Sequence, residues 1–348
     1  MGENNKEPAI DYKIGIIGPT RVGKTSIITA LLEQGQELLA GDAVSIEGVG
    51  ITEKRINQYL DELRGSLMAD EFNPGGLRGN NRKYEFKVQI SVGNSKLTWA
   101  ILDYPGDWLD KGKCPSEKDW EYCQAWIKES IVLLVPIDAA VVMESTTTKE
   151  RQEANKTLQI AQAEQIARKW AKGRIEKNEP GLLILVPVKC ETYFSDNGGR
   201  NDQSEDLFNH IKECYQPLLK AVRQEINGAE KNGAKNKPEI LIQYHPVDTI
   251  GCVEIKSAEW RRENEPGDWV FEAYYLVRPP RERCPKGADG LLIAICRQIT
   301  NLEKNKKRGT LSRFWRWLTQ EDKHLNQAIE KLQAKPFERR VKELQIGG

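Results

Sequence analysis

The chain has 348 residues, of which 39% are hydrophobic and 30% are charged, and its formal net charge is +1. This composition predicts a globular protein of one large or two smaller domains, and no apolar run approaches the ~20 residues that a membrane-spanning helix requires. The seven cysteines include no C-x-x-C pair, which indicates reduced thiols rather than a disulfide or zinc framework and favours the cytosol.

Charge is unevenly distributed along the chain. Residues 304–348 carry twelve Lys/Arg and five Asp/Glu, whereas the rest carries forty and forty-six. The basic tail therefore differs in charge from the mildly acidic body and is treated as a separate unit. The body itself gives no indication of a nucleic-acid surface. The first residues are polar and lack the apolar core of a signal peptide. We therefore predict a disordered N-terminus over 1–10, a domain over 11–303 and a basic amphipathic helical tail over 304–348.

The body alternates short apolar runs with helical patterns, which predicts an α/β fold with a mostly parallel sheet covered by helices. Expected strands are 13–17, 83–91, 97–102, 131–137, 182–188 and 240–244. Expected helices are 26–32, 52–67, 118–129, 149–170, 206–226, 290–302 and, as a C-terminal extension, 311–332. The strand at 83–91 alternates apolar with polar residues and precedes a turn at 93–95. It should therefore pair antiparallel with the next strand and form an antiparallel edge of the sheet.

The first apolar run leads into Gly18-Pro-Thr-Arg-Val-Gly-Lys-Thr25, which matches the phosphate-loop pattern G-x-x-x-x-G-K-[ST]. A strand before the loop and a helix after it are the context in which backbone N–H groups and the helix dipole hold phosphate. Lys24 would reach the β/γ-phosphates and the Thr25 hydroxyl would bind Mg²⁺. Arg21 either contacts a phosphate or stays in solvent. The predicted nucleotide contacts are Gly18, Arg21, Val22, Gly23, Lys24, Thr25 and Ser26.

A second motif follows the strand at 97–102, where the chain continues as Asp103-Tyr-Pro-Gly106. An aspartate at the end of a buried strand can hold the Mg²⁺ shell opposite Thr25, and a glycine three residues later lets its N–H meet a γ-phosphate. We therefore predict Asp103 as a metal-shell residue and Gly106 as a phosphate contact. A plain strand-end turn is the alternative.

A third motif, Val188-Lys189-Cys190-Glu191, follows the strand at 182–188. The stem of Lys189 can lie over a purine ring while the Glu191 carboxylate accepts two N–H donors, a pattern that guanine presents and adenine does not. The motif favours guanine recognition. A surface Lys/Glu pair without a ligand is the alternative.

These three motifs, together with Pro246-Val-Asp-Thr-Ile-Gly251, resemble the P-loop GTPases of the translation-factor and Ras-like class over residues 11–303. The resemblance implies a three-layer P-loop NTPase fold, GTP or GDP with Mg²⁺ as ligands, and Thr249 as a further base contact. The chain departs from the family in lacking the asparagine before Lys189. It also has Asp107 where Ras-like members place the glutamine that orients the attacking water, so we expect slow intrinsic hydrolysis. The long insertions and relaxed base motif are most similar to divergent bacterial GTPases.

About fifty residues separate the first helix from the strand at 83–91. Thr52 is the threonine in this stretch, and a switch segment needs such a hydroxyl to complete the Mg²⁺ shell. Its alternative role is to cap the helix at 52–67. Arg78 lies in a glycine-rich stretch and is a candidate arginine finger in cis. The candidate catalytic residues are thus Lys24, Asp107 and Arg78.

The tail segment 304–318 combines cations with aromatic residues. It either packs against the body, docks on a protein partner, or lies on an anionic membrane surface as a peripheral contact. We expect a cytoplasmic, Mg²⁺-dependent GTP-binding switch with slow hydrolysis that acts on a protein effector or regulator. A P-loop ATPase or kinase and a non-hydrolysing nucleotide-bound scaffold are the alternatives.

Overall fold

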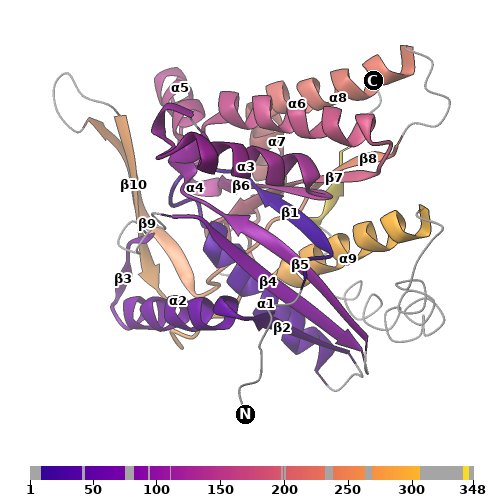
Figure 1. Cartoon of the computed structure of the whole chain (residues 1–348). Helices are drawn as coiled ribbons and strands as arrows, with labels where there is room; N and C mark the ends of the chain where they lie inside the picture. Colours follow the sequence, from indigo (N-terminus) through magenta and orange to yellow (C-terminus); the bar gives the residue numbers. More distant parts are fainter. Residues whose placement is uncertain are drawn as a thin grey trace.

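The computed structural model describes residues 9–40, 44–74, 82–92, 95–109, 111–196, 199, 201–231, 238–262, 269–305 and 340–344. An eight-stranded sheet crosses the molecule in the order β11-β8-β7-β6-β1-β5-β4-β2 (Figure 1). Its strands are β1 (Tyr12–Ile16), β2 (Val44–Val49), β4 (Tyr84–Val92), β5 (Ser95–Asp103), β6 (Val132–Asp138), β7 (Gly181–Val188), β8 (Ile240–Tyr244) and β11 (Lys342–Glu343). The central strands from β8 to β5 are parallel, which confirms the predicted α/β class with a mostly parallel sheet.

The antiparallel part of the sheet is larger than predicted. β4 pairs antiparallel with β5, as its alternating pattern indicates, but β2 pairs antiparallel outside it. β11 is antiparallel to β8 at the opposite edge. The expectation of one antiparallel edge strand is therefore wrong. Residues 44–49 give a weak strand signal because Glu47 and Gly48 interrupt the apolar pattern. Pairing with β4 stabilises the extended conformation that the local sequence only weakly favours.

The helices are α1 (Lys24–Leu39), α2 (Ile51–Leu67), α3 (Glu117–Glu129), α4 (Ala139–Met143), α5 (Thr148–Thr157), α6 (Ile160–Glu176), α7 (Ser204–Cys214), α8 (Gln216–Lys231) and α9 (Ala288–Asn305). The predicted helices at 149–170 and 206–226 are each divided into two helices in the structure. Gln159 interrupts the first with a left-handed backbone (φ 52°), and Pro217 lies in the first turn of the second half of the other, where its missing N–H costs little. The predicted helix at 311–332 and residues 1–8 lie outside the described residues.

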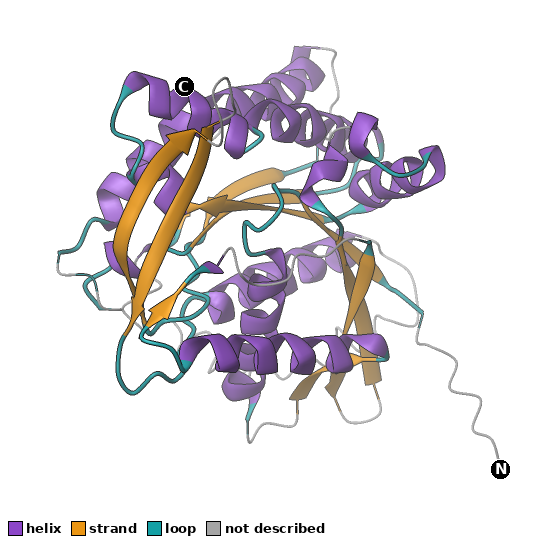
Figure 2. Ribbon diagram, turned by 90° about the vertical axis from the view of Figure 1, so that its left-hand side faces the viewer, coloured by secondary structure: helices purple, strands orange, loops and turns teal. Residues whose placement is uncertain are grey.

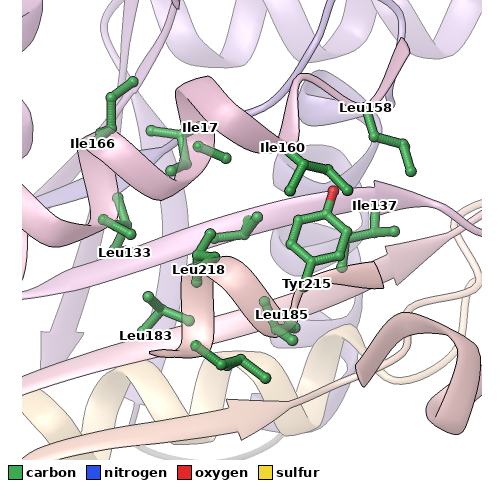
Figure 3. Packing of buried hydrophobic residues seen from close by; sticks show 14 of the residues in the cluster. Ile17, Leu133, Ile137, Leu158, Ile160, Ile166, Leu183, Leu185, Tyr215 and Leu218 are labelled. Carbon is green, nitrogen blue, oxygen red and sulfur yellow. The ribbon is translucent and has the colours of Figure 1, made fainter. Parts of the chain in front are cut away.

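Helices cover both faces of the large sheet (Figure 1). α1 and α9 pack on one face, and α3, α6 and α8 pack on the other. Successive residues of a strand point to opposite faces, so Leu133 and Val132 of β6 enter different hydrophobic clusters. Figure 3 shows the α6 and α8 face, with packed side chains that include Leu133, Leu183, Leu185, Ile166 and Leu218. In the described part of the chain, no helix has both the length and the apolar composition needed to cross a bilayer.

A second, three-stranded antiparallel sheet was not predicted. It consists of β3 (Glu71–Phe72), β10 (Trp269–Val277) and β9 (Val253–Arg262), with β10 in the middle. β3 comes from the insertion before β4, and the β9–β10 hairpin comes from the segment between β8 and α9. The hairpin stands beside the large sheet, with α2 across its base (Figure 2). We call α2 with β3, β9 and β10 the accessory unit.

Candidate functional site

A cleft lies at the carboxyl ends of the parallel strands, between the large sheet and the accessory unit. A water-sized sphere can occupy about 90 Å³ inside it. One wall comes from the Gly18–Thr25 loop, from Asp103–Gly106 and from Lys189, and the facing wall includes Tyr59 and Phe72. Open parallel sheets bind their ligands at this end of the strands. The fold therefore brings three sequence motifs to one place where a small ligand can bind.

The Gly18–Thr25 loop joins β1 to α1 through a tight backbone path. Gly23 has a φ of 103°, which glycine adopts without strain. It is also the N-cap position of α1, and no described side chain caps the helix. The first N–H groups of α1 can therefore serve an anion. The Val22 side chain is buried in the core, so the predicted contact of this residue would be made by its backbone N–H.

Lys24 is a buried cation beside the cleft. Its side chain is 7% exposed, and Nζ donates hydrogen bonds to the backbone oxygens of Gly18 at 3.0 Å and Pro19 at 2.9 Å. Burial lowers the pKa of the ammonium, and the negative charges of Asp103 and Asp107 oppose that shift. The ammonium is thus held by carbonyl oxygens and two nearby carboxylates, and its own positive charge is what would attract an anion into the cleft.

The two predicted metal-binding oxygens are adjacent. Thr25 Oγ1 donates a hydrogen bond to Asp103 Oδ2 at 2.8 Å. Asp103 is 1% exposed, and β5, which ends at this residue, runs parallel to β1. Among the described residues there is no group of three or more His, Cys, Asp or Glu suited to a metal. A metal at Thr25 and Asp103 would therefore draw its remaining oxygen ligands from a bound phosphate and from water.

Gly106 fixes the distance between the two motifs. A Cβ atom at this position would lie 2.0 Å from Thr20 N and 2.1 Å from Pro19 C, so no other residue fits without moving backbone. A short 3-10 helix, η2 (Gly106–Leu109), begins here. Asp107 is exposed in its first turn and does not line the cleft, although its charge acts on Lys24.

Lys189 lines the cleft at the end of β7 with a left-handed backbone (φ 56°). Its ammonium forms an ion pair with Asp138, the last residue of β6. Asp138 Oδ1 also accepts hydrogen bonds from Ala140 N at 3.1 Å and Val141 N at 3.3 Å at the start of α4. Asp138 was not predicted as a site residue, although an aspartate ending a buried strand is the same signal that identified Asp103.

Glu191 is 1% exposed and does not line the cleft. Its Oε1 accepts hydrogen bonds from the backbone N–H groups of Ile250 at 3.0 Å and Gly251 at 3.3 Å. Its Oε2 is buried without a hydrogen-bond partner. Burial raises the pKa of this carboxyl, and the two backbone donors and Lys189 oppose the shift. Glu191 therefore positions the loop from which Thr249 and Ile250 line the cleft.

Thr52, like Asp107 and Glu191, does not line the cleft. Thr52 is buried in the first turn of α2, where its Oγ1 accepts a hydrogen bond from Lys87 N at 2.8 Å. The N-cap of α2 is Gly50, so Thr52 neither caps the helix nor lies at the predicted metal oxygens. Thr52 instead ties α2 to β4, because the pairing of β2 with β4 ends at Val49 and Lys87, directly before α2 begins. Arg78 lies outside the described residues, and Arg21 is exposed at the edge of the cleft.

Tyr59 and Phe72 line the cleft but were not predicted from any sequence motif. Tyr59 Oη and Ser26 Oγ are 2.5 Å apart in a hydrogen bond. Burial raises the pKa of Tyr59 to about 12. Phe72 packs against Tyr275, with ring centroids 6.4 Å apart. Nothing in the amphipathic pattern of α2 distinguishes Tyr59 from an ordinary core position.

Comparison of the chain with family models finds no match, and comparison with curated proteins finds none either. The residues of the cleft are therefore the basis for assigning a function.

Proposed function

We propose that this chain is a Mg²⁺-dependent GTP-binding switch that hydrolyses GTP slowly and signals to a protein partner. The observation that carries the proposal is the meeting of Lys24, Thr25 and Asp103 in one cleft. Thr25 and Asp103 are 78 positions apart in the chain, yet their side chains share a hydrogen bond. A turn without a ligand would not need a buried ammonium near two carboxylates, since burying charge is costly.

Lys24 supports the binding of a triphosphate. Its present partners are the carbonyl oxygens of its own loop, and an ammonium binds charged phosphate oxygens more strongly than neutral carbonyls. The low exposure of the cleft residues strengthens that attraction. The N-terminus of α1 adds N–H donors and a favourable dipole at the same place.

Thr25 and Asp103 would hold the Mg²⁺ ion. A hydroxyl and a carboxylate are hard oxygen donors, which suit Mg²⁺ better than zinc or copper. The hydrogen bond to Asp103 keeps the Thr25 hydroxyl beside the Asp103 carboxylate, so that one ion could contact both oxygens. When bound, the ion supplies positive charge that neutralises the phosphate oxygens.

Glu191 supports a preference for guanine. A buried acceptor without a partner is rare in folded proteins, and Oε2 of Glu191 is one such atom; it lies behind the lining of the cleft, so a base would reach it after a shift of the Thr249–Ile250 segment. Guanine presents N–H donors on the edge where adenine presents an unprotonated ring nitrogen. Because Oε1 already accepts two backbone N–H groups, we expect weaker discrimination than a fully free carboxylate would give.

Asp107 supports slow hydrolysis. It is an exposed anion directly after Gly106, so it would repel the charge that develops on the γ-phosphate and cannot donate a hydrogen bond to it. Faster turnover would require stabilising charge from a partner, as an arginine finger provides in related chemistry. A long-lived bound state that a partner can end is the behaviour of a switch.

The test is to identify the nucleotide that co-purifies with the protein and to titrate GTP, GDP and ATP by calorimetry with Mg²⁺ present. Lys24→Ala should weaken triphosphate binding about ten- to hundredfold, because it removes a charge-assisted contact. Lys172→Ala, at an exposed lysine of α6, is the matched control and should bind normally. Unchanged binding by Lys24→Ala would refute the site. Preference for ATP would favour an ATPase or kinase, and GTP binding without phosphate release would favour a scaffold.

A further inference from the structure

The accessory unit has a hydrophobic cluster of its own, although Ile56 of α2 and Trp260 and Phe271 of the hairpin also pack against the clusters of the large sheet. Its side chains form a third hydrophobic cluster, which includes Leu63 and Leu67 of α2, Phe72 of β3 and Tyr275 of β10. Ile250, which lines the cleft, belongs to the same cluster. The two main clusters lie on the faces of the large sheet. The cleft is therefore bounded by two bodies, each with a hydrophobic cluster of its own, and Figure 2 shows the second body standing at the side of the first.

A hydrogen bond joins the two bodies across the cleft. It connects Tyr59 Oη, in the middle of α2, with Ser26 Oγ, and the two oxygens are 2.5 Å apart. Ser26 follows Thr25 in the first turn of α1. Both side chains line the cleft and are partly buried. The raised pKa of Tyr59 keeps its hydroxyl protonated, and therefore able to donate, throughout the physiological range.

Further contacts hold α2 along its length, and in its middle Ile56 and Leu60 pack against a hydrophobic cluster of the large sheet. Near its start, Thr52 binds the backbone of β4, and the guanidinium of Arg55 lies 3.5 Å from the centre of the Tyr84 ring. Near its end, Leu63 and Leu67 pack within the accessory unit. Tyr59 lies between these attachments and contacts the wall that contains Lys24 and Thr25. Opening the cleft by a movement of α2 must therefore break the Tyr59–Ser26 hydrogen bond.

We propose that Tyr59 is a nucleotide-retaining residue, which with Ser26 holds α2 across the cleft so that bound nucleotide leaves only when this hydrogen bond opens. The inference rests on the proposed function, since it assumes that the ligand is a nucleotide. Tyr59 acts as a positioning residue and needs no contact with the phosphates or the metal. The rate of nucleotide release, and through it the lifetime of the switch state, would then depend on the accessory unit.

The test measures the dissociation rate of a fluorescent GDP analogue after excess unlabelled GDP is added. Tyr59→Phe removes the hydroxyl and keeps the ring, and Ser26→Ala removes its partner. Each single variant should release the analogue about three- to tenfold faster, the loss expected for one hydrogen bond. The double variant should release it no faster than the singles, because all three lack the same bond. Tyr244→Phe is the matched control, since the Tyr244 hydroxyl on β8 is buried without a partner and should not affect release.

Thermal unfolding of the same variants separates retention from simple stabilisation. A structural role alone would lower the unfolding temperature of Tyr59→Phe and leave the release rate unchanged, which would overturn the inference. Additive effects in the double variant would overturn it as well, because the two hydroxyls would then act independently. Failure of the wild-type protein to bind the GDP analogue would overturn the proposed function itself, and it would be seen before any variant is compared.

Discussion

Gly106 is the point at which the segment that begins at Asp103 meets the Gly18–Thr25 loop, and Gly106→Ala should drive the two apart. The added Cβ would lie 2.0 Å from Thr20 N, whereas ordinary contacts begin at 3.4 Å. The backbones would therefore have to separate by about 1.4 Å, because neither neighbour is a flexible side chain. The 2.8 Å hydrogen bond between Thr25 and Asp103 cannot absorb a shift of this size.

Two effects of this substitution are expected. Forcing an extra carbon into a packed contact costs about 1–3 kcal/mol of unfolding free energy, and misplacing ligand-binding groups by about 1 Å can cost up to ~100-fold in function. We expect Gly106→Ala to unfold at lower urea concentration and to bind GDP with Mg²⁺ at least about tenfold more weakly. Gly228→Ala is the control, because a Cβ at this position of α8 meets nothing within 4 Å. It should leave binding unchanged and add about 0.5–1 kcal/mol of stability.

Urea unfolding and calorimetric titration of both variants check the expectation. A Gly106→Ala protein with wild-type stability and wild-type GDP affinity would refute the close approach of the two segments. Loss of stability with full retention of affinity would show that the contact packs the core without positioning the ligand groups.

Four further outcomes are expected. Asp103→Ala should abolish the gain in GDP affinity that Mg²⁺ provides and should leave the affinity measured in EDTA nearly intact. Glu191→Gln should weaken GTP binding about tenfold or more in calorimetry and leave ATP binding unchanged, whereas equal losses would contradict a guanine contact. Single-turnover GTP hydrolysis by wild-type protein should stay below about 1 s⁻¹, and Asp107→Gln should accelerate it more than Asp107→Ala if an amide donor is what is missing. Burial lowers the pKa of His245 to about 3 from an ordinary 6.5, so the unfolded chain takes up a proton there that the native chain does not. The free energy of unfolding should thus fall by about 4 kcal/mol as the pH drops from 6.5 to 3, and urea unfolding of His245→Phe should lack this component.

Much of the cleft could be predicted from the sequence because its motifs are local. An apolar run that ends in Gly18 and resumes as a helical pattern specifies a strand, a loop and a helix in that order. Asp103 ends another apolar run, and the carboxyl ends of parallel strands meet at one edge of a sheet. The adjacency of Thr25 and Asp103 follows from these two facts together.

The contacts around this centre were decided by the tertiary structure. β3 has two residues and exists as a strand only through its pairing with β10, about two hundred positions later. The Thr52 hydroxyl binds the Lys87 N–H because β2 and β4 pair up to that point, and Glu191 Oε1 is turned to Ile250 and Gly251 in the same way. The physical reason is common to these cases. A side chain hydrogen-bonds to the groups that the packed helices and strands leave unpaired nearby, and no pattern within a single segment contains that information.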